Sequence, residues 1–180
     1  MLKTIISCAL VLGAAVSPAL KLAEGQEQPV KPTLSVSVRS AKLSYGIKEK
    51  FQLQIQVENL GGESLLVWRH VGWGVGRMDV RVFDSNGKEV FTTFLADEVP
   101  PMPREDDFIV LEGGEFFGNR VSEDATHFVN TPGTYDIFVE YTSSLPEQYL
   151  RKNLRLPNLP LWSRERGTIA SNKIRIEVTK

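Results

Sequence analysis

The chain has 180 residues, of which 42 % are hydrophobic and 24 % charged, and its formal net charge is −1. This length suits one domain with a sizeable core, since single domains usually span about 100–200 residues. The nearly neutral charge argues against nucleic acid and against an anionic membrane surface as partners, because both are normally bound through a strong positive field.

The first 19 residues have the pattern of a signal peptide. Lys3 gives a basic start, residues 5–16 are apolar, and "SPA" ends at Ala19 with the small residues that signal peptidase requires. The apolar run is only about half of the ~20 residues that a membrane span needs. We therefore predict cleavage after Ala19, or after Ala23, an exported periplasmic or extracellular protein, and no integral membrane segment.

Cys8 is the single cysteine and lies inside this signal. A lipid anchor at Cys8 would leave almost no hydrophobic segment ahead of the cut, so we do not expect lipidation. The mature chain then has no cysteine for a disulfide, a zinc site or a thiol nucleophile, and loss of Lys3 brings its formal charge to −2. Its core alone is expected to hold the domain together.

Residues 20–32 mix charge, glutamine and proline without periodicity, which predicts a flexible lead-in. The following residues alternate between apolar and polar, as in "LSVSV" at 34–38 and "FQLQIQV" at 51–57. Burial of the four large apolar side chains of the second run is worth roughly 6–12 kcal/mol before chain entropy is counted. Both runs are therefore predicted to be half-buried strands.

The same alternation predicts about eight strands and almost no helix. The further segments are "SLLVWRHV", "MDVRVFD", "KEVFTTF", "DFIVLEGGEFFGNRV", "GTYDIFVEYT" and "KIRIEV". "SNGK" at 85–88 supplies an Asn-Gly turn, which is typical of a tight hairpin. Short strands separated by turns predict an all-β fold over residues 33–180, an antiparallel two-sheet β-sandwich, with a barrel as the alternative.

Residues 143–172 interrupt the strand pattern. Leu145, Tyr149 and Leu150 have helical spacing behind Pro146, which predicts a short helix. The insertion is about 30 residues long, whereas hairpin loops usually have about 2–5 residues. Loops of this length are often functional.

The stretch "NTPGTYDIFVEY" and the final "SNKIRIEV" resemble the corresponding strands of immunoglobulin-like and fibronectin-like sandwich domains of exported bacterial proteins. The resemblance covers residues 33–180. It implies that Tyr135 is the tyrosine-corner residue, that Trp68 is the buried tryptophan of the third strand, and that "VENLGGESL" is the turn after the second strand. The fold hosts many unrelated functions and does not identify an activity.

Two residues beyond Tyr135, antibody domains carry a disulfide cysteine, and this chain has Ile137. The resemblance therefore implies an apolar pair in that space, Ile137 with Leu53 or Ile55. This difference excludes an antigen receptor.

Catalytic patterns are absent from the sequence. His70 and His127 are the two histidines, and no G-x-S-x-G motif is present for nucleophilic catalysis. We predict that the protein is not an enzyme and carries no cofactor. The acidic stretch "ADEVPPMPREDDF" offers Asp97, Asp106 and Asp107 as oxygen ligands for calcium, with a solvated acidic loop as the alternative.

The strongest predicted surface lies between Tyr149 and Arg166, where five basic residues and one acidic residue give a local formal charge of +4. Arginine forks and aromatic rings at this spacing suit a partner with acidic and apolar features. The candidate contacts are Tyr149, Arg151, Arg155, Trp162 and Arg164. Alternatively, the leucines of the segment and Trp162 cap the open end of the sandwich, and both roles can coexist.

The stretch "GWGVG" at 72–76 is not a phosphate loop, because a strand and not a helix follows it. Its glycines are predicted to serve a turn. Trp73, in its centre, is either a buried plug or an exposed ligand contact.

These patterns together predict an exported, non-enzymatic, immunoglobulin-like module that binds a protein or a surface glycan. One alternative is an accessory domain of a secreted hydrolase with a structural calcium. Another is a chaperone-like protein that captures a strand of its partner at a sheet edge. The sequence leaves the oligomeric state open.

Overall fold

The computed structural model describes residues 34–69, 78–92 and 102–180, with Phe91 and Thr92 described by their backbone alone. Residues 31–180 belong to one compact unit. Several predictions therefore lie outside the described residues: the signal peptide 1–19 with Cys8, the lead-in 20–32, His70, Trp73 and Asp97.

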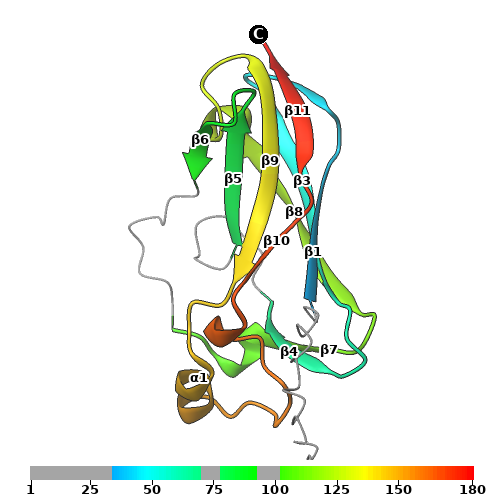
Figure 1. Ribbon diagram of the computed structural model, residues 1–180, viewed down its shortest axis with the longest axis vertical. Helices are drawn as coiled ribbons and strands as arrows, with labels where there is room; N and C mark the ends of the chain where they lie inside the picture. The colour runs from blue at the N-terminus through cyan, green and yellow to red at the C-terminus, as the bar shows by residue number, and fades with distance from the viewer. Residues whose placement is uncertain (1–33, 70–77, 93–101) are drawn as a thin grey trace, which may run out of the picture. The chain divides into compact units, whose positions relative to one another are not determined.

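Two sheets form an all-β sandwich (Figure 1). The first has the order β1-β3-β8, with β1 at Leu34–Ser40, β3 at Lys50–Asn59 and β8 at Phe116–Asp124. The second has the order β2-β11-β9-β5-β6, built from Ser44–Gly46, Ile174–Thr179, Gly133–Thr142, Met78–Asp84 and Glu89–Thr92, with β10 (Thr168–Ala170) paired to β9. All these pairings are antiparallel except that of β2 with β11.

The core lies between the two sheets, as the alternation predicts. On β3, Phe51, Leu53, Ile55 and Val57 are each at most 2 % exposed, whereas the side chains between them face outward. Apolar residues of β1, β5, β9 and β11 belong to the same buried cluster. Period-two side-chain alternation therefore separates one apolar face from one polar face in each sheet.

The hairpin and the tyrosine corner are confirmed. Gly87 has φ +77° in the turn between β5 and β6, a conformation that favours glycine. The Tyr135 hydroxyl donates to the Thr131 carbonyl at 2.8 Å. Ile137 is fully buried in the cluster that also holds Leu53 and Ile55.

A second, smaller core lies beside the sandwich. Strand β4 (Leu65–Trp68) pairs with β7 (Phe108–Leu111), and all four β4 residues are buried, in contrast to the half-buried strand predicted there. Both faces are covered because residues 143–167, named here the cap segment, run along β4. The Leu66 amide donates to the Pro160 carbonyl at 2.8 Å, and the Trp162 amide donates to the Leu66 carbonyl at 2.9 Å.

The cap segment contains the predicted short helix, α1 (Glu147–Asn153), and the short strand β10 follows it, which the sequence did not predict. Leu150 of α1 and Leu161 are buried against Trp68 and Phe108 in the second core. Trp68 is buried as predicted, but the resemblance placed it on the wrong strand. In an immunoglobulin-like sandwich the third strand pairs with the strand of the tyrosine corner, which here is β9. The strand that pairs with β9 in this way is β5, whereas Trp68 lies on β4.

Within the described part of the chain, no helix has the length and apolar character needed to cross a membrane.

Candidate functional site

The outer face of the β1-β3-β8 sheet presents three rows of side chains across its strands. The strand registers align Arg39 with Gln54 and Arg120, Ser37 with Gln56 and Gly118, and Ser35 with Glu58 and Phe116. We call these nine residues the polar sheet face. They share one side of the sheet because residues paired across neighbouring strands point to the same face.

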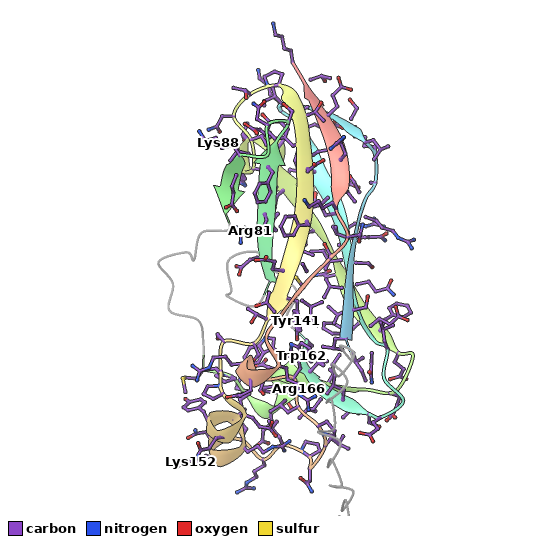
Figure 2. All side chains as sticks on the ribbon, viewed as in Figure 1. Arg81, Lys88, Tyr141, Lys152, Trp162 and Arg166 are labelled. Atoms are coloured by element: carbon purple, nitrogen blue, oxygen red, sulfur yellow. The ribbon has the colours of Figure 1, made fainter. Side chains whose placement is uncertain are left out.

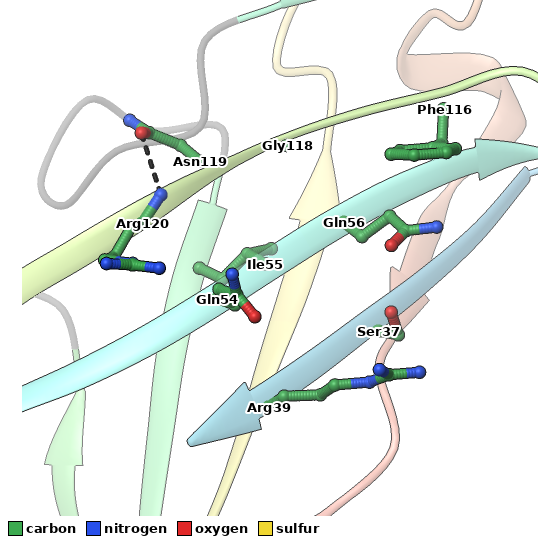
Figure 3. A pocket seen from close by; sticks show the side chains of 9 residues that line it. All are labelled: Ser37, Arg39, Gln54, Ile55, Gln56, Phe116, Gly118, Asn119 and Arg120. Carbon is green, nitrogen blue, oxygen red and sulfur yellow. Dashed lines mark hydrogen bonds between the residues drawn. The ribbon is translucent and has the colours of Figure 1, made fainter. Parts of the chain in front are cut away.

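A groove of about 380 Å³ crosses the polar sheet face (Figure 3). Gly118 is one of its lining residues, and a Cβ atom there would lie 2.2 Å from the Ile55 carbonyl oxygen. The missing side chain lets β8 approach β3 closely and leaves the groove open between Phe116 and Arg120. The residues lining the groove are Ser37, Arg39, Gln54, Ile55, Gln56, Phe116, Gly118, Asn119 and Arg120.

The two arginines of the groove are exposed at its surface. Arg39 and Arg120 are exposed, and neither side chain has an ion pair or hydrogen-bond partner among residues 34–69, 78–92 and 102–180. Figure 3 shows the Arg39 side chain extending past Ser37 and the Arg120 guanidinium beside Gln54. The groove therefore combines two available cations with neutral amide groups.

Phe116 is the aromatic group of the site. Its side chain is 63 % exposed, and its ring lies over β3 beside Gln56 (Figure 3). A single exposed apolar side chain is common on protein surfaces. Phe116 differs in that its ring lines a groove together with polar side chains, which is the composition of ligand sites.

The outer face of the second sheet is also polar, but its two arginines are paired with carboxylates. Arg81 donates to Glu89 at 2.9 Å and to Glu140 at 3.1 Å, and these hydrogen bonds raise the pKa of its guanidinium. Burial, and then the charge of Glu140, raise the pKa of the Asp79 carboxyl. Figure 2 shows Arg81 on β5. Arg81 is therefore bonded to carboxylates of the two neighbouring strands.

Arg175 and Asp136 form a second pair on the same face. The Arg175 Nε atom donates to Asp136 at 2.7 Å, and this hydrogen bond lowers the pKa of the Asp136 carboxyl. Beside this pair, Phe83 and Phe138 stack with ring centroids 5.6 Å apart.

The residues predicted on the cap segment divide into internal and exposed ones. Arg151 is internal: it donates to Glu147 at 2.7 Å, to the Leu159 carbonyl at 2.6 Å and to the Pro157 carbonyl at 3.2 Å. These bonds tie α1 to the chain that follows it. Arg151 thus stabilises the cap segment.

Trp162 is 3 % exposed and belongs to the main core. Figure 2 shows it near Tyr141, at the end of the sandwich. Tyr149 is half-buried against the second core, and its hydroxyl donates to the Met102 sulfur at 3.7 Å. Arg155 and Arg164 face solvent. The structure thus gives this segment the capping role, and its exposed arginines remain candidate contacts.

The last acidic residues of the acidic stretch form a short 3₁₀ helix, η1 (Glu105–Asp107). Asp107 is buried and accepts a hydrogen bond from the Arg104 amide at 2.8 Å, so its carboxylate caps the helix. Asp106 is exposed. Among the described residues, no three His, Cys, Asp or Glu side chains are grouped to hold a metal ion.

The polar sheet face was missed because its glutamines alternate with apolar residues and so indicate only an outward surface. Two signals in the sequence point to it. Arg120 and Phe116 have the same parity on their strand, and a glycine inside a strand, Gly118, marks a close backbone approach.

No protein family and no curated protein matches this sequence. The solved structures similar to the chain include a β-glucosidase of Erythrobacter marinus, with 12 % identity and a TM-score of 0.41 over 81 % of this chain and 15 % of that one. A second is the CARDB domain of a Pyrococcus furiosus protein in complex with di-metal ions, with 14 % identity and a TM-score of 0.38 over 82 % and 93 %.

An alkylpurine DNA glycosylase of Pseudomonas fluorescens, bound to DNA containing an abasic site analog, has 10 % identity and a TM-score of 0.41 over 82 % of this chain and 31 % of that one. The chain thus spans only a small part of both enzymes. Likeness at this level carries no inference about function. The strand order and the tyrosine corner themselves define the class, an all-β immunoglobulin-like sandwich.

Proposed function

We propose that this protein is an exported, non-enzymatic binding module that recognises a glycan through its polar sheet face. The observation that carries this proposal is the groove, in which the amides of Gln54 and Gln56 and the ring of Phe116 are accessible together.

The groups in the groove match the chemistry of a sugar. A sugar ring presents several hydroxyls that both donate and accept hydrogen bonds, and a glutamine amide does the same, with two donors and one acceptor oxygen. The apolar C–H face of a sugar packs on an aromatic ring such as Phe116. The groove volume of about 380 Å³ lies within the usual range for ligand sites, about 300–1,000 Å³.

The same groups support a binding role over a catalytic one. The polar atoms that line the described groove belong to amides, guanidiniums and a hydroxyl. A guanidinium stays protonated throughout the physiological range, and amides do not titrate. These groups hold and orient a ligand, whereas general acid–base catalysis relies on a group that gains and loses a proton near the working pH.

A glycan array and three variants of the full chain test the proposal. Gln54→Ala/Gln56→Ala removes the amides from the groove, and Phe116→Ala removes its ring. Gln52→Ala is the matched control, because Gln52 faces outward on the same strand but does not line the groove. We expect both groove variants to weaken binding at least about tenfold, the effect of one or two lost hydrogen bonds or of one aromatic contact.

The control should bind as the wild type does. Circular dichroism and thermal unfolding check that each variant is folded. Wild-type protein that binds no glycan on the array would contradict the proposal, and so would folded groove variants that bind unchanged. Loss of binding in Arg155→Gln/Arg164→Gln alone would move the site to the cap segment.

A further inference from the structure

We infer that the glycan bound by the polar sheet face carries a carboxylate, as a uronic acid does, and that Arg39 and Arg120 hold this group. The inference rests on the proposed function and names its ligand class. It starts from the row in which Arg39, Gln54 and Arg120 lie side by side on three adjacent strands.

The spacing of the row suits one anionic group. Adjacent strands lie about 4.8 Å apart, so the backbones of Arg39 and Arg120 are separated by about 10 Å. Figure 3 shows Arg120 beside Gln54 and Arg39 directed past Ser37, so Arg39 has to turn toward Gln54 for both guanidiniums to hold one group. Each side chain is long enough to reach the middle of the gap, where Gln54 offers an amide donor. A guanidinium presents parallel N–H groups that match the two oxygens of a carboxylate.

The charges of the surrounding face also favour an anion. Among the nine residues of the polar sheet face the one acidic residue is Glu58, two register rows away from the arginines and beside Phe116. Asp124, which has the same parity on β8 as Arg120, also lies two rows away and is opposite Lys50. On the second sheet, by contrast, Arg81 and Arg175 are each bonded to a carboxylate of a neighbouring strand. Arg39 and Arg120 have no such partner in the described chain, so both guanidiniums are available to an anionic ligand.

The number of charges argues for a single acidic sugar over an extended polyanion. Nucleic acid and anionic membranes are bound by many basic groups, and their binding falls steeply with salt. Here two arginines flank neutral hydrogen-bonding groups, and Phe116 lies at the far end of the groove. The site therefore fits a ring that is anionic at one edge, neutral along its hydroxyls and apolar on one face.

Matched polymers test the inference on the full chain. Polygalacturonate, alginate and hyaluronate are each compared with their carboxyl-reduced forms, which keep the backbone but lose the charge. Binding is measured by isothermal titration calorimetry and affinity electrophoresis. We expect at least one uronate polymer to bind, its reduced form to bind about tenfold or more weakly, and Arg39→Gln or Arg120→Gln each to remove most of that difference.

Arg155→Gln/Arg164→Gln is the control, because it removes the same charge from the cap segment and should leave the preference intact. Phe116→Ala should weaken the acidic and reduced forms alike. Dextran sulfate tests for general attraction to polyanions.

Three outcomes overturn the inference. The first is equal binding of acidic and reduced polymers, and the second is an acid preference that survives Arg39→Gln/Arg120→Gln. The third is dextran sulfate binding that equals the uronate binding and falls equally in the cap-segment control. If neutral glycans bind the array while every uronate fails, this inference falls and the proposed function stands. If no glycan of any kind binds, the proposed function falls as well.

Discussion

The cap segment and the polar sheet face use the same kinds of residue in opposite ways. Both contain arginines and aromatic rings. In the cap segment, Arg151 bonds to the chain around it and Trp162 is buried. On the sheet face, Arg39 and Arg120 have no partner among the described residues, and Phe116 is exposed.

A basic, aromatic stretch of sequence therefore does not by itself indicate an exposed binding surface. Side chains that are neighbours along an irregular segment can satisfy one another, because the chain is free to fold around them. Outward side chains on adjacent strands are held apart by the sheet and remain available to a ligand. Four predictions probe this contrast.

The largest effect is expected in the cap segment. Leu161 is fully buried in the second core, so Leu161→Ala should lower the free energy of unfolding by about 2–5 kcal/mol. Urea unfolding followed by tryptophan fluorescence measures it. Arg155→Gln/Arg164→Gln, on the exposed side of the segment, should stay within about 0.5 kcal/mol. A cost below about 1 kcal/mol for Leu161→Ala would mean that the segment does not cap the fold.

The next effect concerns the floor of the groove. Gly118→Ala should cost about 1–3 kcal/mol, because the added Cβ would meet the Ile55 carbonyl oxygen and push β8 from β3. Gly62→Ala is the control, since a Cβ there has no neighbour within 4 Å. Thermal unfolding compares the two variants. Equal melting temperatures for the two variants would show that the packing of β8 against β3 does not require glycine at position 118.

A smaller effect separates the two kinds of arginine. Arg151→Gln removes the donor from the Leu159 and Pro157 carbonyls and should cost about 1 kcal/mol. Arg39→Gln should leave stability nearly unchanged, because an exposed charge with no partner in the described part of the chain contributes little. Denaturant unfolding in parallel measures both variants. The contrast fails if Arg39→Gln proves as destabilising as Arg151→Gln.

The smallest effect uses the paired outer face of the second sheet. The pKa of Asp79 is raised by burial and by Glu140, so its charged form destabilises the fold above that pKa. Asp79→Asn should therefore raise the melting temperature at pH 7. This gain should shrink as the pH falls and vanish below the unfolded-state pKa of about 3.9.

Asp136→Asn provides the opposite sign. Arg175 lowers the pKa of Asp136, so this carboxylate stabilises the fold above its unfolded-state pKa and loses that contribution as the pH falls through the folded-state pKa. Melting temperatures of both variants between pH 3 and pH 7 check the two signs. Parallel curves for the two variants would contradict this account.

The sequence alone determined the all-β fold, the apolar face of each strand, the Asn-Gly hairpin, the tyrosine corner and the short helix. Each of these depends on residues close together in the chain. Alternation with period two specifies a half-buried strand, and a glycine with positive φ specifies a turn, whatever the rest of the molecule does.

The tertiary structure alone decided which outward residues meet. Arg39, Gln54 and Arg120 come from three separate strands, and only the pairing registers bring them into one row. The second core likewise depends on the cap segment covering β4. The continuous apolar run of β4 is consistent with burial of both faces, but it does not indicate which segment covers it. The register of strand pairing and the segment that covers a strand are both set by long-range packing. The local periodicity of the sequence therefore does not specify them.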